Sequence, residues 1–133
     1  YEGNHTYNTN GCSNPSQYEF PIVEYDQRVD NRQAVTGGYV YRGSMIGGMQ
    51  SKYVFADYAS GEIWLATPDF QGDWDMQLWQ DSGLVISSFG EDENGEIYVV
   101  HISGAVYRFT SASSIFGDPF ETADLSGWPG STP

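Results

Sequence analysis

The stretch Ser60-Gly61-Glu62-Ile63-Trp64 returns 34 residues later as Asn94-Gly95-Glu96-Ile97-Tyr98. A third copy, Ser103-Gly104-Ala105-Val106-Tyr107, keeps the order of a small or amide side chain, glycine, any residue, a β-branched residue and an aromatic residue. Glycine adopts the positive φ that tight turns need, and β-branched and aromatic side chains suit a pleated strand. Each copy therefore predicts a turn that leads into a strand.

Short apolar runs separated by glycines continue this pattern along the chain, and no sustained helical stripe of apolar residues accompanies them. The repeat spacing is close to the length of one four-stranded propeller blade, about 40–45 residues, so an all-β propeller is favoured over a sandwich. The runs predict eight strands: Tyr18–Tyr25, Tyr39–Arg42, Tyr53–Asp57, Glu62–Thr67, Met76–Gln80, Ile86–Phe89, Glu96–His101 and Ala105–Thr110.

The composition excludes several classes of partner. The 133 residues contain 18 Asp and Glu but only 5 Lys and Arg, which gives a formal charge of −13. This charge repels phosphate backbones and anionic lipid surfaces, so we expect no nucleic-acid or membrane partner. No apolar run approaches the roughly 20 residues that cross a bilayer. Cys12 is the single cysteine, so no intrachain disulfide or multi-cysteine zinc site can form.

The domain organisation follows from a change in composition near the C-terminus. Residues 111–133 lose the strand periodicity and are rich in Gly, Pro, Ser and Thr, which is typical of a linker or terminal extension. We therefore expect a partial propeller domain over residues 1–110 and an extension over residues 111–133.

Four ordered motifs resemble the C-terminal part of the glucose/sorbosone dehydrogenase family: Pro21–Asp26, Ala34–Gly43, Tyr53–Trp64 and Ile86–Tyr98. This family comprises soluble sugar dehydrogenases that depend on pyrroloquinoline quinone (PQQ), and the chain is also similar to the related propeller of Hedgehog-interacting proteins. The resemblance extends from Tyr1 to about Phe109.

The family fold is a six-bladed propeller much longer than this chain. The resemblance implies that Tyr18–Tyr25 is the outer strand of one blade, that the next four strands form a complete blade, and that the last three form an incomplete final blade. Blade faces and strand edges left bare in such a fragment seek partners. We therefore expect the remainder of the propeller, or other chains, to complete the ring.

The resemblance also implies PQQ and Ca²⁺ as cofactors, with a sugar as the substrate and a histidine as the base. Neither His5 nor His101 matches the position of that histidine, so no catalytic residue is assigned in this chain. Family enzymes usually place cationic residues at the positions of Ala59, Val85 and Ser87, and their absence argues against PQQ binding in the usual manner.

Four residues are candidates for cofactor binding: Thr36, Asp57, Tyr58 and Ser87. Thr36 matches a small hydroxyl residue near the cofactor in the family, and its alternative role is that of a turn residue before Gly37. Asp57 and Tyr58 end a strand at the expected top face of the ring, and Asp57 alternatively caps the following turn.

Metal binding is not favoured by either acidic cluster. Glu91–Glu96 holds four carboxylates, but it lacks the spacing of a 12-residue calcium loop, so a solvated turn is the preferred interpretation. The same holds for Asp69, Asp73 and Asp75. We assign no metal ligand.

Two functions therefore remain open. The chain is either the C-terminal segment of a PQQ-dependent sugar dehydrogenase, acting mainly as a scaffold, or a non-catalytic extracellular propeller module. Such a module would bind protein or glycan, or build an assembly. The family and the Lys-poor, acidic composition imply a secreted or periplasmic location.

Overall fold

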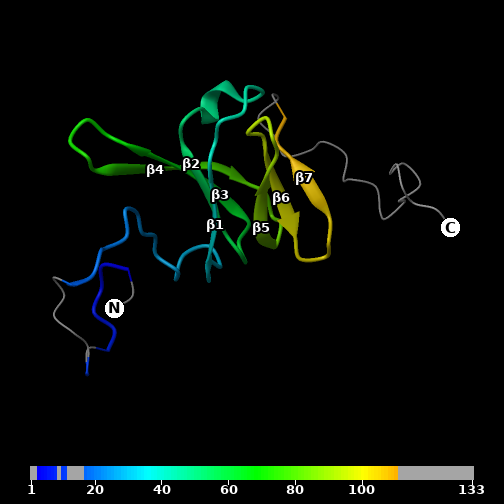
Figure 1. Ribbon diagram of the computed structural model, residues 1–133. Helices are drawn as coiled ribbons and strands as arrows, with labels where there is room; N and C mark the ends of the chain where they lie inside the picture. The colour runs from blue at the N-terminus through cyan, green and yellow to red at the C-terminus, as the bar shows by residue number, and fades with distance from the viewer. Residues whose placement is uncertain (1–2, 9, 12–16, 111–133) are drawn as a thin grey trace.

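The computed structural model describes residues 3–8, 10–11 and 17–110, and within them the chain is all-β (Figure 1). The extension expected over residues 111–133, and Cys12, lie outside the described residues. The elements, in chain order, are β1 (Val35–Val40), the 3₁₀ turn η2 (Gly47–Met49), β2 (Tyr53–Asp57), β3 (Glu62–Pro68), β4 (Trp74–Asp81), β5 (Ile86–Glu91), β6 (Ile97–His101) and β7 (Val106–Arg108).

The strands form two antiparallel sheets, one in the order β1-β2-β3-β4 and the other in the order β5-β6-β7. Each sheet is a meander in which every strand pairs with its neighbour in sequence. This confirms the predicted fold class, an all-β propeller fragment. The prediction had one complete four-stranded blade and parts of two neighbours, and the described strands form the complete blade and part of one neighbour. The turn glycines of the repeat are confirmed too, because Gly61 and Gly95 both have a φ of 77°.

The prediction of a strand at Tyr18–Tyr25 is wrong, since this segment is irregular and joins neither sheet. Pro21 lacks the N–H that a ladder needs. Its neighbours Val23 and Tyr25 nevertheless pack against the four-stranded sheet. The segment thus takes part in the core without pairing as a strand.

The first paired strand starts at Val35, earlier than the predicted Tyr39. The ladder between β1 and β2 is irregular from Thr36 to Tyr39, so the two glycines at 37–38 lie at a bulge inside the strand. Gly38 passes so close to the backbone of Val54 that a Cβ atom there would clash with it. The close approach of β1 to β2 therefore requires a glycine at position 38. The sequence pattern suggested a turn at these glycines, whereas they lie inside a strand.

The central strands β2 and β3 are buried on both faces. On one face Val54, Ala56, Ile63 and Leu65 join Ile86, Phe89, Ile97 and Val99 of the other sheet in the main core. Full burial of one such aliphatic side chain stabilises the fold by about 1.5–3 kcal/mol. The opposite face carries a second, smaller cluster around Phe55 and Trp64. We call this opposite side of the four-stranded sheet the open face.

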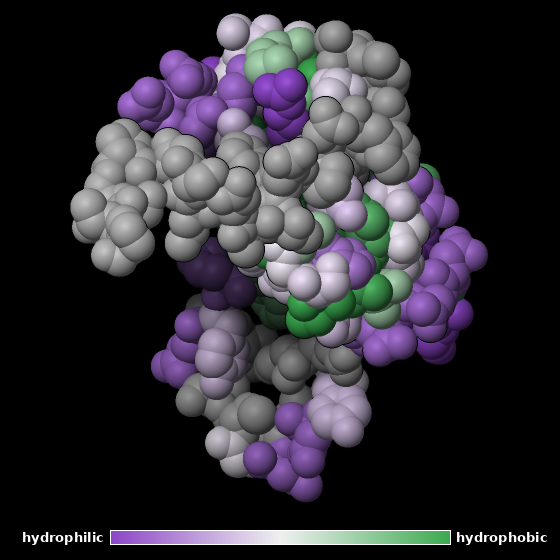
Figure 2. Space-filling model, turned by 90° about the vertical axis from the view of Figure 1, so that its right-hand side faces the viewer, coloured by the Kyte–Doolittle hydropathy of each residue, from purple (hydrophilic) through white to green (hydrophobic). Residues whose placement is uncertain are grey.

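Hydrogen bonds join the two sheets near the start of β5. The Thr36 hydroxyl donates to the Ile86 carbonyl at 2.9 Å, and the Ile86 N–H donates to the Tyr58 carbonyl at 3.1 Å. Seen from the side of β7, hydrophobic residues gather in the middle of the surface between hydrophilic ones (Figure 2). Apolar packing between the sheets is thus supplemented by directional bonds that fix their relative position.

Candidate interface on the open face

The open face of the four-stranded sheet is largely apolar, with the buried carboxylates of Asp57 and Glu62 at one end. The register places on it the side chains of Val35, Tyr53, Phe55, Trp64, Ala66, Trp74, Met76 and Leu78. Phe55, Trp64 and Ala66 are buried at its centre, whereas Val35 is 63% exposed and Leu78 is 43% exposed. The cover over this face is therefore incomplete, in contrast to the face that meets the second sheet.

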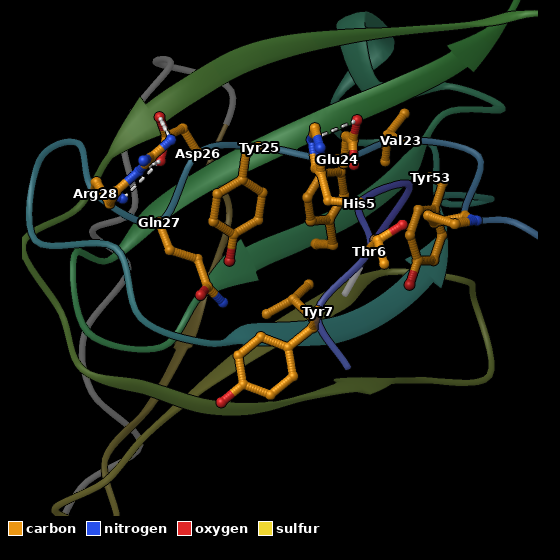
Figure 3. A pocket seen from close by; sticks show the side chains of 14 residues that line it. His5, Thr6, Tyr7, Val23, Glu24, Tyr25, Asp26, Gln27, Arg28 and Tyr53 are labelled. Atoms are coloured by element: carbon orange, nitrogen blue, oxygen red, sulfur yellow. Dashed lines mark hydrogen bonds and ion pairs between the residues drawn. The ribbon is translucent and has the colours of Figure 1, made fainter. Parts of the chain in front are cut away.

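A cavity of about 710 Å³ lies over the β1–β2 side of the open face. Its floor is formed by Val35, Tyr53 and Phe55, and its walls come from residues 21–28 and from the N-terminal segment 3–7. Figure 3 shows the rings of Tyr7, Tyr25 and Tyr53 around this space. Three stretches that are distant in sequence thus meet at one apolar hollow.

Glu24 holds the N-terminal segment at the rim of this cavity. Its Oε2 accepts a 2.9 Å hydrogen bond from the backbone N–H of Asn4, and its Oε1 lies 3.6 Å from Nε2 of His5. The bond from Asn4 keeps the pKa of Glu24 below its usual value, with a smaller contribution from His5. Gly3 has a φ of 58°, and a Cβ there would lie 2.6 Å from the Glu24 carboxylate, so glycine makes this approach possible.

Asp57 is fully buried beneath the cavity wall, and both of its carboxylate oxygens are used. Oδ2 accepts hydrogen bonds from the Tyr25 hydroxyl at 2.8 Å and from the N–H groups of Gln33 and Ala34. Oδ1 accepts the N–H groups of Ala59 and Ser60, both at 2.9 Å. Burial raises the pKa of Asp57, but these bonds outweigh it, so the pKa lies below its usual value. Asp57 thus caps the turn after β2 and anchors the segment before β1.

Arg32 provides the second anchor of that segment. Its guanidinium makes two hydrogen bonds to the Glu62 carboxylate, one of them 2.8 Å long, and lies 5.0 Å from the ring centre of Trp64. Tyr25 stacks on Trp64 with ring centres 6.3 Å apart. Cation–π contacts of this kind add stability to the ion pair.

The sequence analysis predicted no packing contact for Arg32, Glu62 or Glu96. The repeat contained a signal for the two acids, because both follow its glycine directly. In the structure each of these carboxylates holds an earlier part of the chain: Glu62 bonds to Arg32, and Glu96 to Tyr41 and Ser44. The acid that follows the turn glycine of the repeat therefore marks a contact with an earlier segment of the chain.

Most of the polar side chains around the cavity make hydrogen bonds or ion pairs within the chain. Besides Tyr25, the Tyr53 hydroxyl accepts the Gly38 N–H at 3.3 Å, and Gln27 donates to the Gln33 carbonyl at 3.0 Å. Arg28 is paired with Asp26 at 3.0 Å. The cavity consequently offers aromatic and aliphatic surface, which suits an apolar partner better than a polyhydroxylated one.

The four predicted cofactor-binding residues, Thr36, Asp57, Tyr58 and Ser87, come together around the start of β5. Thr36 and Tyr58 both bond to Ile86, as described above, and Ser87 donates its hydroxyl to the Val100 carbonyl at 3.0 Å. Both carboxylate oxygens of Asp57 accept hydrogen bonds, and Tyr58 is 36% exposed. These internal bonds support structural roles for Thr36, Asp57 and Ser87, and their part in PQQ binding stays a prediction.

The acidic turn at Glu91–Glu96 is held by its own side chains. The Asp92 carboxylate accepts the N–H groups of Asn94 and Glu96 at 2.9 and 3.0 Å. Among the residues that the structure describes, no group of three or more His, Cys, Asp or Glu side chains is placed to hold a metal ion. Glu96, for its part, bonds to the loop after β1.

No protein-family model matches the chain. Within the described ranges, no helix is long and apolar enough to cross a membrane. The resemblance to the glucose/sorbosone dehydrogenase family stays a prediction from the sequence motifs.

Proposed function

We propose that this chain is a non-catalytic propeller module that builds an assembly. Its open face packs against a further β-sheet, which belongs to the same polypeptide or to another chain. One observation carries this proposal: the four-stranded sheet is apolar on both faces, and the β5–β7 sheet covers only one of them.

The chemistry of the open face supports a protein sheet as the partner. Contiguous exposed apolar surface marks interaction sites in soluble proteins. Because most of the hydroxyl and charged groups near the cavity already bond within the chain, a glycan would find few donors and acceptors there beyond the hydroxyls of Thr6 and Tyr7. An apolar sheet face would instead bury Val35 and Leu78 together with the half-buried rim.

The alternative function, a PQQ-dependent sugar dehydrogenase, would also need a further sheet on the open face, because this chain would act there as part of the propeller scaffold. It additionally needs groups that bind the carboxylates of PQQ, and the family's cationic positions hold Ala59, Val85 and Ser87 here. This difference favours the non-catalytic function. The acidic, Lys-poor composition and the resemblance support a secreted or periplasmic location.

Site-specific photo-cross-linking in the native full-length protein tests this function. A photoreactive phenylalanine analogue replaces Val35 on the open face, and in a second variant it replaces Ile102, which is 57% exposed near the end of β6. We expect the Val35 variant to cross-link to an apolar β-strand segment outside this chain, identified by mass spectrometry, and the Ile102 variant not to do so. Equal labelling by water at both positions would contradict the proposal.

A further inference from the structure

A second unpartnered feature is the outer edge of β4, which lies at the far edge of the four-stranded sheet from the cavity over β1 and β2. In the part of the chain that the structure describes, no strand pairs with the outer edge of β4. β4 has eight residues and is the longest strand in the described ranges. Figure 1 shows the β3–β4 hairpin projecting away from the rest of the molecule. Its outer edge therefore has no strand neighbour within the described ranges.

Proteins usually protect such an edge with charged side chains, above all lysine, with proline, with a β-bulge or by keeping the strand very short. The sequence of β4, Trp74-Asp75-Met76-Gln77-Leu78-Trp79-Gln80-Asp81, contains neither lysine nor proline. A single bulge opposite Ile63 and Trp64 interrupts the ladder with β3. From Trp74 to Leu78 the strand is regular and can accept a neighbour.

The two sides of this regular part differ in chemistry. Successive side chains of a strand point to opposite faces of the sheet. The open face therefore carries Trp74, Met76 and Leu78, and the other face carries Asp75 and Gln77. A strand added to this edge presents its own residues with the same alternation, about 4.8 Å away. Its side chains would therefore meet apolar groups and polar or acidic groups in turn.

Charge decides which kind of strand fits. Residues 53–107 contain ten carboxylates and neither lysine nor arginine. Five of the ten belong to the β3–β4 hairpin: Glu62, Asp69, Asp73, Asp75 and Asp81. This region attracts cations and repels a second copy of the chain, which also carries a charge of −13. A basic partner is thus favoured over self-association.

We propose that the outer edge of β4 binds an extended peptide segment in which Lys or Arg alternate with apolar residues. Main-chain hydrogen bonds to Trp74–Leu78 supply the pairing, as in other cases of strand addition. The basic residues lie beside Asp75, and the apolar ones extend the surface formed by Met76 and Leu78. The partner is thus an accessory protein or segment at the outer side of the sheet, separate from the sheet that covers the open face.

Synthetic peptides test this site on the full chain. The probe is an acetylated peptide of four alternating lysine–valine pairs, and its matched control has four lysines followed by four valines. Tryptophan fluorescence and amide hydrogen exchange report binding. We expect the alternating peptide to bind at least about tenfold more tightly and to slow exchange in β4. Equal affinity of the two peptides, or absence of binding, would overturn the proposal.

Two further comparisons separate strand pairing from simple charge attraction. Alternate N–H groups of a strand point to opposite sides, so only one set of peptide amides, that of the lysines or that of the valines, faces β4. N-methylation of that set should abolish binding, whereas N-methylation of the other set should leave binding intact. Retention by both methylated peptides would exclude strand addition. Asp75→Lys should weaken binding at least about tenfold, whereas Glu93→Lys, the same charge change on an exposed turn of the other sheet, should have much less effect. An equal loss in both variants would contradict a site at β4.

Discussion

Tyr41 donates a 2.6 Å hydrogen bond to Oε2 of Glu96, and this bond joins the loop after β1 to the second sheet. The other oxygen of Glu96 accepts the N–H groups of Ser44 and Met45 at 2.8 and 3.0 Å. The Tyr41 hydroxyl in turn accepts the N–H of Ile46 at 2.9 Å. Burial and the bond to Glu96 raise the pKa of Tyr41. One carboxylate thus fixes a loop whose anchor, Tyr41, is fully buried.

Glu96→Ala should therefore destabilise the fold by about 3 kcal/mol, because it leaves a buried hydroxyl and two N–H groups without their acceptor. Urea unfolding followed by tryptophan fluorescence measures this change. Glu93→Ala, on the exposed part of the same turn, serves as the control and should change stability by less than about 0.5 kcal/mol. Similar midpoints for the two variants would show that the bonds of Glu96 do not hold the sheets together.

Asp57 allows a graded test of the anchor at the other end of β1. Asp57→Ala removes the acceptor of five hydrogen bonds in a buried site and should cost at least about 3 kcal/mol. Tyr25→Phe removes one of these bonds and should cost about 1 kcal/mol. Thermal unfolding by circular dichroism compares the variants. Tyr25→Phe keeps the ring that stacks on Trp64. If it were as damaging as Asp57→Ala, the single bond from the Tyr25 hydroxyl, rather than the full set of five, would carry the anchor.

The sheets could be predicted from the sequence because their determinants are local. The turn glycines Gly61 and Gly95 and the apolar residues that follow them specify turn and strand within a few positions. The segment Tyr18–Tyr25 also shows local alternation, yet it forms no strand. Its conformation depends on packing of Val23 and Tyr25 on a sheet that is formed by later residues, and no local pattern contains that information.

The interface could be predicted only in outline. Bare blade faces were expected from the number of strands, but the position of the cavity depends on contacts such as Asn4 to Glu24, which are 20 residues apart. Arg32 gave no signal, since its partners Glu62 and Trp64 lie about 30 residues away. Long-range pairs of this kind have no periodicity in the sequence.

The ion pair between Arg32 and Glu62 predicts a specific dependence of stability on pH. The hydrogen bonds from Arg32 lower the pKa of Glu62 below its ordinary value of 4.5. A depressed pKa in the folded state means that the pair stabilises the protein fully above about pH 4.5, and that this contribution is lost as the pH falls through the lower, folded-state value. The difference in unfolding free energy between the wild type and Glu62→Gln should therefore be largest near neutral pH and should shrink below pH 4.5.

Urea unfolding from pH 7 to pH 3 measures this difference. Asp26→Asn is the control, because the pair of Asp26 with Arg28 is exposed and contributes little to stability at any pH. A gap between the wild type and Glu62→Gln that stayed constant across this range would show that the charge of Glu62 is not what Arg32 requires.

The resemblance places cationic residues at positions 59, 85 and 87, and their absence predicts that the protein does not oxidise sugars with PQQ. The test reconstitutes the full-length protein with PQQ and Ca²⁺ and follows aldose-dependent dye reduction, together with retention of PQQ after gel filtration. We expect neither activity nor retention. Ala59→Lys combined with Val85→Arg should increase PQQ retention, because each adds a partner for a cofactor carboxylate, whereas Glu93→Lys should not. Sugar-dependent reduction by the unmodified protein would instead establish the dehydrogenase function and leave the packing on the open face as its scaffold.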